Sequence, residues 1–573
     1  MEHVDVLVVG AGWYGLMAAE TYLKLAPETN LLVVDDGDTI GGIWNQERIY
    51  PSLHAQNSYP LFEYSSYPMK KEGISSLGFI PGQTIHNYLV NFAKDHDLVR
   101  RIRLRTRVTQ VRRSANHQGW VVETESGERP IKCDKLIYAT GATSSPIRPK
   151  WPRENFDQPV IHSLDIATNL SLIESDTIQR VTVVGASKSS YDTVYQLLKA
   201  GKKVDWVIRP TVSGGFSIFA PTFMFFWRIS DFVSTRFACS FSPSIMSTIG
   251  PWDRFLQRTK IGRLLVRLYW RVGTSLAAAY ARFGDSEHTK HLQPWPHPDG
   301  LFWGSGGIGV ATVPDFWEVI HKGDVTMHRT EIESLSHHDV VNLKNGTSVA
   351  TDIVIQCTGF DKGYDTFSPQ LQEELGLHYD PSTFSKWTVL DAQAEQKVDA
   401  LLPILKNSPF DSMEHKKHGQ GPNRHYRRLI VPELAARGDR SILFPGHIHA
   451  ALTPVAAEIQ ALWGFAFLNG WMKVPEQEEM EMEAATFNAW TRKRYIEQGK
   501  KHSYIVYDFI SYLDTLMRDL GLNPRRKRTF FEEWFTPYRP RDYRGLIQEY
   551  LTAHSRRVPA DKKMCEEEMS VNE

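Results

Sequence analysis

The chain has 573 residues, of which 42% are hydrophobic and 23% are charged. This length exceeds what one hydrophobic core supports, and the composition excludes a chain that is disordered throughout, so two or three domains are expected. The 66 basic residues equal the 66 acidic ones, so nothing in the charge balance indicates a nucleic acid or an acidic partner.

The cysteines argue against disulfide and metal chemistry. Four occur, far apart and without a C-x-x-C pair: Cys133, Cys239, Cys357 and Cys565. This excludes a redox disulfide and a structural zinc site, no metal site is expected, and a reducing compartment is indicated. The N-terminus enters an apolar run at once, without a charged and then apolar leader. A cytoplasmic protein is therefore expected.

The first forty-five residues predict a strand, a tight turn, a helix and a second strand. The turn follows the pattern G-x-G-x-x-G, with Gly10, Gly12 and Gly15. The first glycine permits the turn, the second lets the backbone approach a pyrophosphate, and the third lets the helix pack closely. Asp35 ends the second strand, where a carboxylate accepts hydrogen bonds from ribose hydroxyls and disfavours a 2′-phosphate. The ligand is therefore FAD or NAD, not NADP.

Residues 40–45 favour FAD. They place Gly41, Gly42 and Trp44 directly after the ribose-binding strand. This segment resembles the flavin-containing and Baeyer–Villiger monooxygenase families, in which a GG-x-W stretch runs along the flavin. The resemblance implies that Gly42 and Trp44 contact FAD. An ordinary glycine turn beside a core tryptophan is the alternative.

Residues 50–68 predict an irregular, aromatic-rich loop over a flat cofactor. In flavin-containing monooxygenases a T-N-S stretch at this point supplies an asparagine close to the flavin and its oxygen adduct. The resemblance implies that Asn57, in the Gln56-Asn57-Ser58 stretch, takes that position. An asparagine that caps a turn is the alternative.

Two later strands end in the same pair of residues. The apolar run 135–139 ends in Thr140-Gly141, and the run 353–357 ends in Thr358-Gly359; an acid precedes each glycine by the same interval. A small Thr-Gly ending lets the backbone touch a dinucleotide. The repetition predicts that the whole dinucleotide-binding unit occurs twice.

A second phosphate loop follows the apolar run 181–184. Gly185, Ser187 and Ser190 take the places of the three glycines, and small hydroxyl residues still permit close approach. The next strand ends at Arg209. A cation there suits a ribose 2′-phosphate, so NADPH is favoured over NADH at this site. A solvated arginine at a strand end is the alternative.

The monooxygenase families carry a fingerprint, F-x-G-x-x-x-H-x-x-x-aromatic, between the two loops. Phe156 and His162 match it, whereas Gln158 and Ile166 replace the glycine and the final aromatic residue. The partial match supports kinship, and it leaves His162 open as a catalytic or a structural histidine.

Residues 211–300 are predicted to form an apolar helical insertion. Residues 211–227 are uncharged and aromatic-rich, but they are shorter than a membrane-spanning helix requires. Residues 261–283 place arginines among apolar residues at roughly helical spacing. We expect a cover over an apolar substrate, and peripheral contact with a membrane is the second interpretation.

Residues 442–446 predict a strand that feeds a helix from about Pro454. In related flavoproteins this helix points at the flavin ring, which implies that His447 lies beside the ring, whereas His449 could as easily be a surface residue. The last hundred residues are helical by pattern, with a polar tail from Arg556 that is expected to be disordered.

The fold class expected is α/β, with two dinucleotide-binding, Rossmann-like domains and the NADP domain inserted in the FAD domain. Residues 1–165 and 346–470 are expected to form the FAD domain. Residues 166–345 are expected to form the NADP domain with the insertion 211–300, and residues 471–573 a helical C-terminal region.

The resemblance implies an NADPH-dependent flavin monooxygenase, similar to fungal members that tailor small molecules in secondary metabolism. In that family NADPH reduces FAD, O₂ adds at the flavin C4a, and the hydroperoxide passes one oxygen atom to the substrate. Asn57 and His447 are the expected catalytic residues, and the expected partners are an apolar small molecule and O₂.

Several alternatives remain open. Oxidation of a nitrogen or sulfur atom competes with Baeyer–Villiger insertion into a ketone, and Asn57 before a serine favours the first. A flavin oxidase or dehydrogenase without oxygen transfer is the runner-up, and a nucleotide-bound scaffold without activity is the last. The sequence makes no prediction of the oligomeric state.

Overall fold

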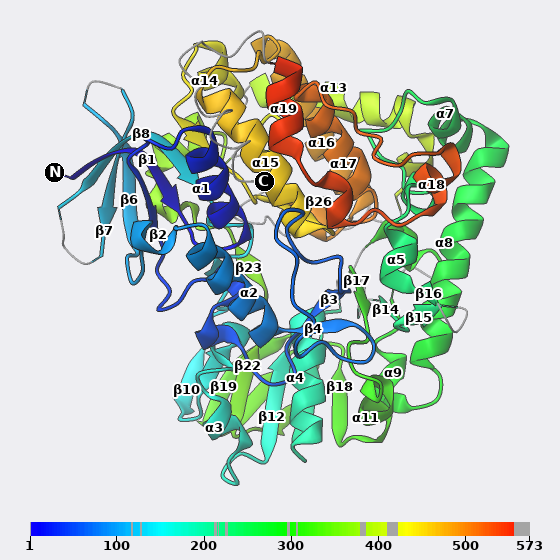
Figure 1. The fold of residues 1–573 in the computed structure, drawn as a ribbon. Helices are drawn as coiled ribbons and strands as arrows, with labels where there is room; N and C mark the ends of the chain where they lie inside the picture. Colours follow the sequence, from blue (N-terminus) through cyan, green and yellow to red (C-terminus); the bar gives the residue numbers. More distant parts are fainter. Residues whose placement is uncertain are drawn as a thin grey trace.

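The structure is a computed structural model, and it describes residues 2–115, 118–125, 129–210, 215, 217–223, 227–294, 298–304, 307–378, 386–408 and 422–554. Two sheets, one mixed and one parallel throughout, form two units, one above the other in Figure 1. Helices from the C-terminal third lie beside the upper unit, and one long helix runs along the right-hand edge.

The first sheet forms from the apolar runs around the glycine-rich turn. Its strands are β1 (Glu2–Val9), β2 (Leu31–Val34), β5 (Ile102–Arg103), β6 (Val108–Arg113), β7 (Trp120–Thr124), β8 (Ile131–Tyr138) and β24 (Ile442–Leu443). Strands β5, β2, β1 and β8 are parallel neighbours in that order, and β24 is parallel to β8. Strands β7 and β6 continue from β8 in antiparallel pairing. The side chains of Val6, Leu7 and Val8 are at most 1% exposed, as expected for a strand covered on both faces.

Two helices cover the first sheet next to its glycine-rich turn. Helix α1 (Trp13–Leu25) follows β1, and helix α15 (Thr453–Leu468) packs against α1. Helix α15 is buried at every position from Pro454 to Leu468, and apart from Glu458 and Gln460 these residues are accordingly apolar on all sides of the helix. A short antiparallel pair, β3 (His54–Ser58) with β4 (Phe79–Pro81), leads into helix α2 (Gly82–Asp95).

The second sheet is parallel throughout. Its order is β11 (Val160–His162), β22 (Ile353–Gln356), β12 (Arg180–Val184), β13 (Lys203–Val207) and β18 (Val325–His328). Helix α4 (Lys188–Lys199) follows β12 and packs against helix α11 (Phe316–Lys322). A separate layer pairs β10 (Arg153–Phe156) with β19 (Ile332–His338), β20 (Val340–Leu343) and β21 (Ser348–Ala350).

The two sheets repeat one arrangement, which confirms the predicted fold class. The order β24-β8-β1-β2-β5 in the first sheet corresponds to β11-β22-β12-β13-β18 in the second. The expected boundaries do not follow this pairing, because β11 precedes residue 166 and β22 follows residue 345 although both belong to the second sheet. The chain crosses between the units at β9 (Ser145–Pro146) and β23 (Phe360–Asp361), which pair with each other.

The expected insertion begins with short strands: β14 (Ser217–Phe219), β15 (Thr222–Phe223) and β16 (Trp227–Arg228). It continues with helices α5 (Ile229–Val233), α6 (Arg236–Ser240), α7 (Pro251–Arg258), α8 (Lys260–Ala281) and α9 (Glu287–Lys290). Much of the aromatic stretch 211–227 lies outside the described residues. Among the helices of the described ranges, none is long and apolar enough to cross a bilayer.

The remaining elements are mostly helical. They are α10 (Gly300–Trp303), β17 (Ile308–Val310), α12 (Pro369–Glu374), α13 (Lys386–Leu401), α14 (Pro432–Ala436), β25 (Ile448–Ala450), α16 (Gln477–Arg494), β26 (Ser503–Ile505), α17 (Phe509–Asp519), α18 (Phe530–Phe535) and α19 (Leu546–His554). The tail that was expected to be disordered lies outside the described residues.

Candidate active site

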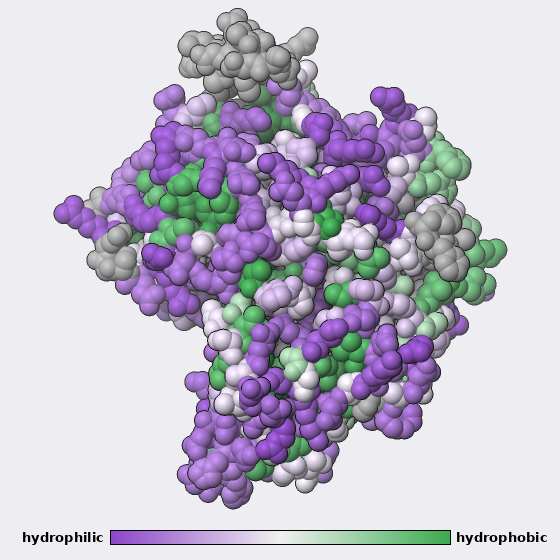
Figure 2. All heavy atoms as spheres, turned by 60° about the horizontal axis from the view of Figure 1, so that its bottom comes forward, coloured by the Kyte–Doolittle hydropathy of each residue, from purple (hydrophilic) through white to green (hydrophobic). Residues whose placement is uncertain are grey.

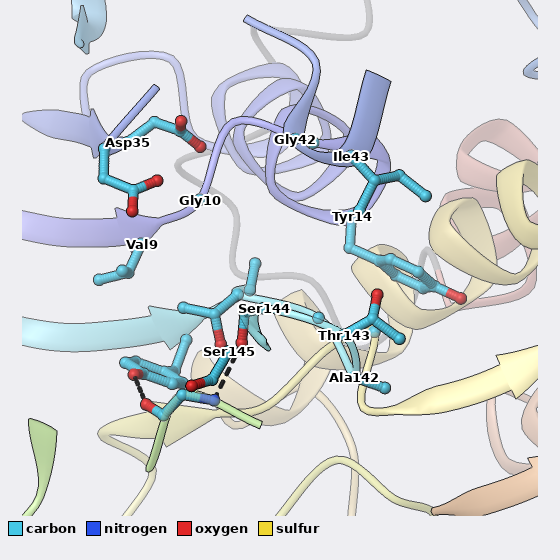
Figure 3. A pocket seen from close by; sticks show the side chains of 18 of the residues that line it. Val9, Gly10, Tyr14, Asp35, Gly42, Ile43, Ala142, Thr143, Ser144 and Ser145 are labelled. Atoms are coloured by element: carbon cyan, nitrogen blue, oxygen red, sulfur yellow. Dashed lines mark hydrogen bonds between the residues drawn. The ribbon is translucent and has the colours of Figure 1, made fainter. Parts of the chain in front are cut away.

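A cleft of about 710 Å³ lies at the carboxyl ends of the first sheet's strands. Six of the predicted cofactor-binding residues line it: Gly10, Gly12, Asp35, Gly42, Thr140 and Gly141. In Figure 3, Asp35, Gly10 and Tyr14 border one side of this cleft, and Thr143, Ser144 and Ser145 border the other. The ends of parallel strands are where nucleotides bind in such sheets.

The glycine-rich turn is shaped for close approach. Gly10 has φ +109°, and a Cβ on it would lie 2.6 Å from the carbonyl oxygen of Ala139. A Cβ on Gly15 would lie 1.8 Å from the carbonyl oxygen of Gly10, so only glycine lets α1 start so near the strand. Helix α1 begins after Gly12 without a side-chain cap, which leaves its N-terminus directed at the cleft as an anion site.

Asp35 ties the end of β2 to the turn. Its carboxylate accepts hydrogen bonds from the backbone N–H groups of Ala11 (2.6 Å) and Gly37 (2.9 Å). Burial raises the pKa of Asp35, and the two N–H donors oppose this by lowering it. A carboxylate has about four acceptor positions, so Asp35 keeps capacity for ribose hydroxyls.

At the opposite end, the cleft is lined by His449 rather than by His447. His447 is 2% exposed; the Tyr364 hydroxyl donates to its Nδ1 (2.7 Å), and its Nε2 donates to the carbonyl oxygen of Tyr138 (3.1 Å). Burial lowers the pKa of His447 to about 3. Both ring nitrogens are therefore engaged by the protein, behind the cleft wall.

Asn57 and Trp44 lie next to the lining residues. The Asn57 side chain is half-buried and donates to the carbonyl oxygen of Ala451, which is the neighbour of the lining residue Ala450. Trp44 is 8% exposed and packs on Phe62 with ring centroids 6.1 Å apart. Whether either residue contacts a bound flavin stays a prediction.

Three residues that the sequence interpretation did not assign to the site have buried polar atoms at the cleft. The Tyr14 hydroxyl, the Asn45 Oδ1 and the His449 Nε2 have no hydrogen-bond partner among the described residues, although all three residues line the cleft. A buried polar atom without a partner costs free energy. A polar ligand in the cleft would satisfy these atoms. Tyr14 lies inside the x-x of the glycine motif, so its position was available from the sequence, but its orientation was not.

The second phosphate turn repeats the geometry of the first. Gly185 has φ +127°, and a Cβ on it would lie 2.2 Å from the carbonyl oxygen of Cys357. Ser187 is exposed at the N-terminus of α4, whereas the buried Ser190 hydroxyl donates to the Ser187 carbonyl oxygen (2.6 Å). Gly185, Ser187, Ser190 and Arg209 are not among the residues that line the 710 Å³ cleft.

The second Thr-Gly pair lies where the chain crosses between the units. The Thr358 hydroxyl donates to the carbonyl oxygen of Ile147 (2.5 Å), and the carbonyl oxygen of Gly359 accepts from His162 Nε2 (3.1 Å). His162 Nδ1 accepts from the backbone N–H of Leu164 (3.1 Å). His162 is thus engaged on both nitrogens, and the structure supports its structural interpretation.

Three cations lie between the two units, and sequence reasoning found one of them. Arg209 follows β13 and is exposed. The pKa of Lys501 is lowered mainly by the burial of Lys501 itself and, to a smaller extent, by the positive charge of Arg209. Lys362 is 2% exposed, and its Nζ donates to the Lys501 carbonyl oxygen (2.7 Å). Burial lowers the pKa of Lys362 to about 8. Burial of His449, followed by the positive charge of Lys362, lowers the pKa of His449 to about 4, so the His449 imidazole is neutral.

Comparison with known proteins agrees with this geometry. A family model described as pyridine nucleotide-disulphide oxidoreductase matches residues 7–216. Its disulfide chemistry has no counterpart in the described residues, where Cys133, Cys239 and Cys357 are buried and free.

Two relatives match over nearly the whole chain. An FAD-dependent monooxygenase of Alternaria brassicicola, DEP4, is 62% identical over 96% of this chain and 95% of its own. An FAD-dependent monooxygenase of Aspergillus nomiae, rstn6, is 36% identical over 96% of this chain and 98% of its own. Among solved structures, cyclohexanone monooxygenase from Rhodococcus sp. Phi1 bound to NADP+ matches with a TM-score of 0.57 at 16% identity, over 91% of this chain and 98% of that one.

Proposed function

The chain belongs to the FAD-dependent monooxygenases, and from that premise we propose that it uses NADPH and O₂ to oxygenate an apolar small molecule in secondary metabolism. The observation that carries the proposal is the pair of nucleotide turns. One has a carboxylate directly after its second strand, Asp35, and the other has a cation, Arg209, two residues after the end of the corresponding strand. The carboxylate suits FAD, and the cation suits the 2′-phosphate that distinguishes NADPH from NADH.

The residues of the cleft fit FAD. Its pyrophosphate would meet the N-terminus of α1 at Gly12, and its ribose would meet Asp35. The unpartnered atoms of Tyr14, Asn45 and His449 would gain hydrogen bonds from the bound molecule. When bound, FAD would accept two electrons from NADPH and would transfer one atom of O₂ to the substrate, while the other atom leaves as water.

The chain's own residues position the reactants and exclude water. Gly185 lets the backbone approach NADPH, and Arg209 with Lys501 surrounds its phosphate with positive charge. Ile448 and Val506 contribute apolar side chains to the lining of the cleft near His449. The neutral His449 can donate or accept one hydrogen bond there without adding a charge.

Oxidation of a nitrogen or sulfur atom is the preferred reaction. Asn57 precedes Ser58, and its side chain is held by Ala451, one residue from the cleft wall. An amide in this place orients an oxygen donor through hydrogen bonds without withdrawing a proton. Baeyer–Villiger insertion is distinguished by its product, because a ketone then gives an ester or lactone.

The test is anaerobic reduction of the purified yellow protein by NADPH and, separately, by NADH, followed by a pulse of oxygen without substrate. We expect bleaching that is faster with NADPH. After the pulse we expect a transient spectrum that matches neither reduced nor oxidised flavin. Immediate return to oxidised flavin with stoichiometric hydrogen peroxide, also when candidate substrates are present, would indicate an oxidase. No bleaching by either nucleotide would contradict the proposal and indicate a scaffold.

A further inference from the structure

Helix α8 exposes apolar side chains on the outside of the molecule. Its buried positions repeat at helical spacing and face the interior: Gly262, Val266, Trp270, Ala277 and Ala281. A second stripe at the same spacing faces solvent, with side chains 38 to 66% exposed: Ile261, Leu264, Leu265, Leu268, Val272 and Leu276. A surface helix normally needs only the first stripe. Helix α8 therefore has one apolar face for its own domain and another that nothing in the described residues covers.

A row of cations lies between these two stripes. Lys260, Arg263, Arg267 and Arg271 occupy the positions next to the exposed aliphatic residues, and α8 contains no Asp or Glu. From Arg254 to Ala281 the chain carries basic residues and no acidic one, although the whole chain has 66 of each sign. Arg271 pairs with Asp299, whereas none of the ion pairs of the described residues involves Lys260 or Arg267.

Aromatic side chains extend this surface beyond α8. Helix α7 packs on α8, and Trp252 of α7 contacts Trp534 of α18 edge to face at 6.2 Å. Helix α18 exposes Phe530 and Phe531, which are 69% and 72% exposed. Figure 1 places α7, α8 and α18 along the right-hand side, and Figure 2 shows hydrophobic surface gathered at that same edge. We call this surface, formed by the exposed side of α8 and by Phe530 and Phe531, the α8–α18 face.

We propose that the α8–α18 face docks on the surface of a lipid bilayer with anionic headgroups. Apolar side chains on one side of an in-plane helix, arginines and lysines beside them, and aromatic residues at the rim are the features of interfacial binding. Long basic side chains can extend from an apolar surface to the headgroup phosphates while their stems stay in the apolar layer. Patches of this kind on a monomer mark interaction sites.

The charge selects lipid over the other occupants. If a second copy of the chain docked on this face, Lys260 and Arg267 of one copy would lie near the same cations of the other. The repulsion between these like charges disfavours such a dimer. A bilayer with anionic lipids supplies the opposite charge over its whole surface, and it accepts a convex helix without a matching groove. Because no described helix spans a bilayer, the chain would lie on the membrane rather than cross it.

The test uses the full-length flavin-loaded protein and sedimentation with vesicles of phosphatidylcholine, with or without phosphatidylserine. We expect binding to the mixed vesicles that weakens at high salt, and little binding to phosphatidylcholine alone. The variant Leu264→Asp/Leu268→Asp should weaken binding by about tenfold or more, because it removes two interfacial apolar side chains. Arg267→Glu should weaken binding by about fivefold or more.

The matched control is Val389→Asp on helix α13, because Val389 is 45% exposed and lies outside the α8–α18 face. It should bind vesicles like the unaltered protein. All variants should keep bound flavin and the same rate of bleaching by NADPH, which shows that they fold. Binding that survives the changes at Leu264, Leu268 and Arg267 overturns the proposal. So does an unaltered protein that ignores the mixed vesicles, or a dimer that Leu264→Asp/Leu268→Asp dissociates.

Discussion

The two dinucleotide units share a backbone and differ in the side chains that surround it. In both, a glycine with positive φ follows the first strand, and its Cβ would strike the carbonyl oxygen before a Thr-Gly pair. The backbone N–H of Gly10 donates to the carbonyl oxygen of Val34, and that of Gly185 donates to the carbonyl oxygen of Val207. The two turns therefore make equivalent hydrogen bonds. What the turn itself requires is therefore kept in both units.

The differences lie where the helix meets the strand. In the first unit, the Gly10 carbonyl lies against Gly15, and no larger residue fits. In the second unit, the Gly185 carbonyl accepts a hydrogen bond from the Trp206 indole (2.6 Å), and Ser190 occupies the helix position. The second unit thus accommodates a serine at the helix position where the first unit requires a glycine.

The largest effect is expected from exchanging the residues at this position. Gly15→Ser should prevent accumulation of flavin-loaded protein, because its Cβ would lie 1.8 Å from a backbone oxygen that cannot move cheaply. The free energy of unfolding should fall by about 3 kcal/mol or more. The reverse change, Ser190→Gly, should cost only about 1 kcal/mol, for one hydrogen bond and one helical glycine. Thermal unfolding and the ratio of flavin to protein absorbance measure both.

The comparison fails if Gly15→Ser keeps its flavin and its melting temperature while Ser190→Gly loses them. Gly15→Ala is the intermediate control, since it adds the same Cβ without a hydroxyl and should be nearly as damaging.

The next effect is expected at Asp35. Asp35→Ala removes the acceptor for the Ala11 and Gly37 N–H groups and for the ribose, so FAD affinity should fall by about a hundredfold or more. Asp35→Asn should be milder because one acceptor oxygen remains. Titration of the deflavinated protein with FAD measures the affinity. If Asp35→Ala and the unaltered protein bound FAD with equal affinity, the proposed role of Asp35 in FAD binding would be contradicted.

The corresponding change in the second unit is Arg209→Ala. We expect the dissociation constant for NADPH to rise by about tenfold to a hundredfold, the usual range for a charge-assisted hydrogen bond, with little change for NADH. Rapid-mixing reduction of the flavin by each nucleotide separates the two. Arg153→Ala is the control, since Arg153 is an exposed arginine on β10 of the same unit. Equal effects of Arg209→Ala on NADPH and NADH would contradict its role.

The smallest effect is expected at a carboxyl group that lies behind the phosphate helix of the first unit. Glu458 on α15 accepts from the backbone and hydroxyl of Ser65 through Oε1, while its buried Oε2 has no partner among the described residues. Burial raises the pKa of Glu458 from 4.5 to about 8. The folded protein therefore keeps a proton that the unfolded chain releases, and this contribution to stability is lost as the pH rises from about 4.5 to about 8.

Glu458→Gln should therefore raise the melting temperature at about pH 8 and leave it nearly unchanged at about pH 5. We expect a gain of about 1 kcal/mol, since Glu458 also lines a separate cavity of about 530 Å³ where water reduces the penalty. Unfolding at the two pH values measures it. An equal gain at both would show that the carboxyl is ionised throughout or that the effect is not electrostatic.

Much of the fold was predictable because its signals are local. The G-x-G-x-x-G turn with Asp35, and the two Thr-Gly endings, led to the repeated unit. Six predicted cofactor residues do line one cleft. The domain boundaries were not predictable, because β11 has three residues and β24 has two, and segments so short show no periodicity.

Side-chain orientation accounts for the other differences. His449 lies within the short strand β25 and His447 directly before it, so the alternation of side chains along a regular strand does not predict which of the two faces the cleft. Lys362 follows the crossing strand β23, and the residues next to it in the sequence do not predict that its side chain is buried. For α8, the sequence shows apolar residues on two sides, and periodicity alone does not say which side packs inward.

The interleaving of the two sheets also sets an order of completion during synthesis. The last strand of the second sheet, β22, ends at Gln356, whereas the first sheet still needs β24 from Ile442 and helix α15 from Thr453. As the chain leaves the ribosome from its N-terminus, the second unit has all its strands while α1 of the first unit still lacks its covering helix. The segment made earliest is therefore the last to be enclosed, and until then its apolar surface is open to chaperones and to aggregation.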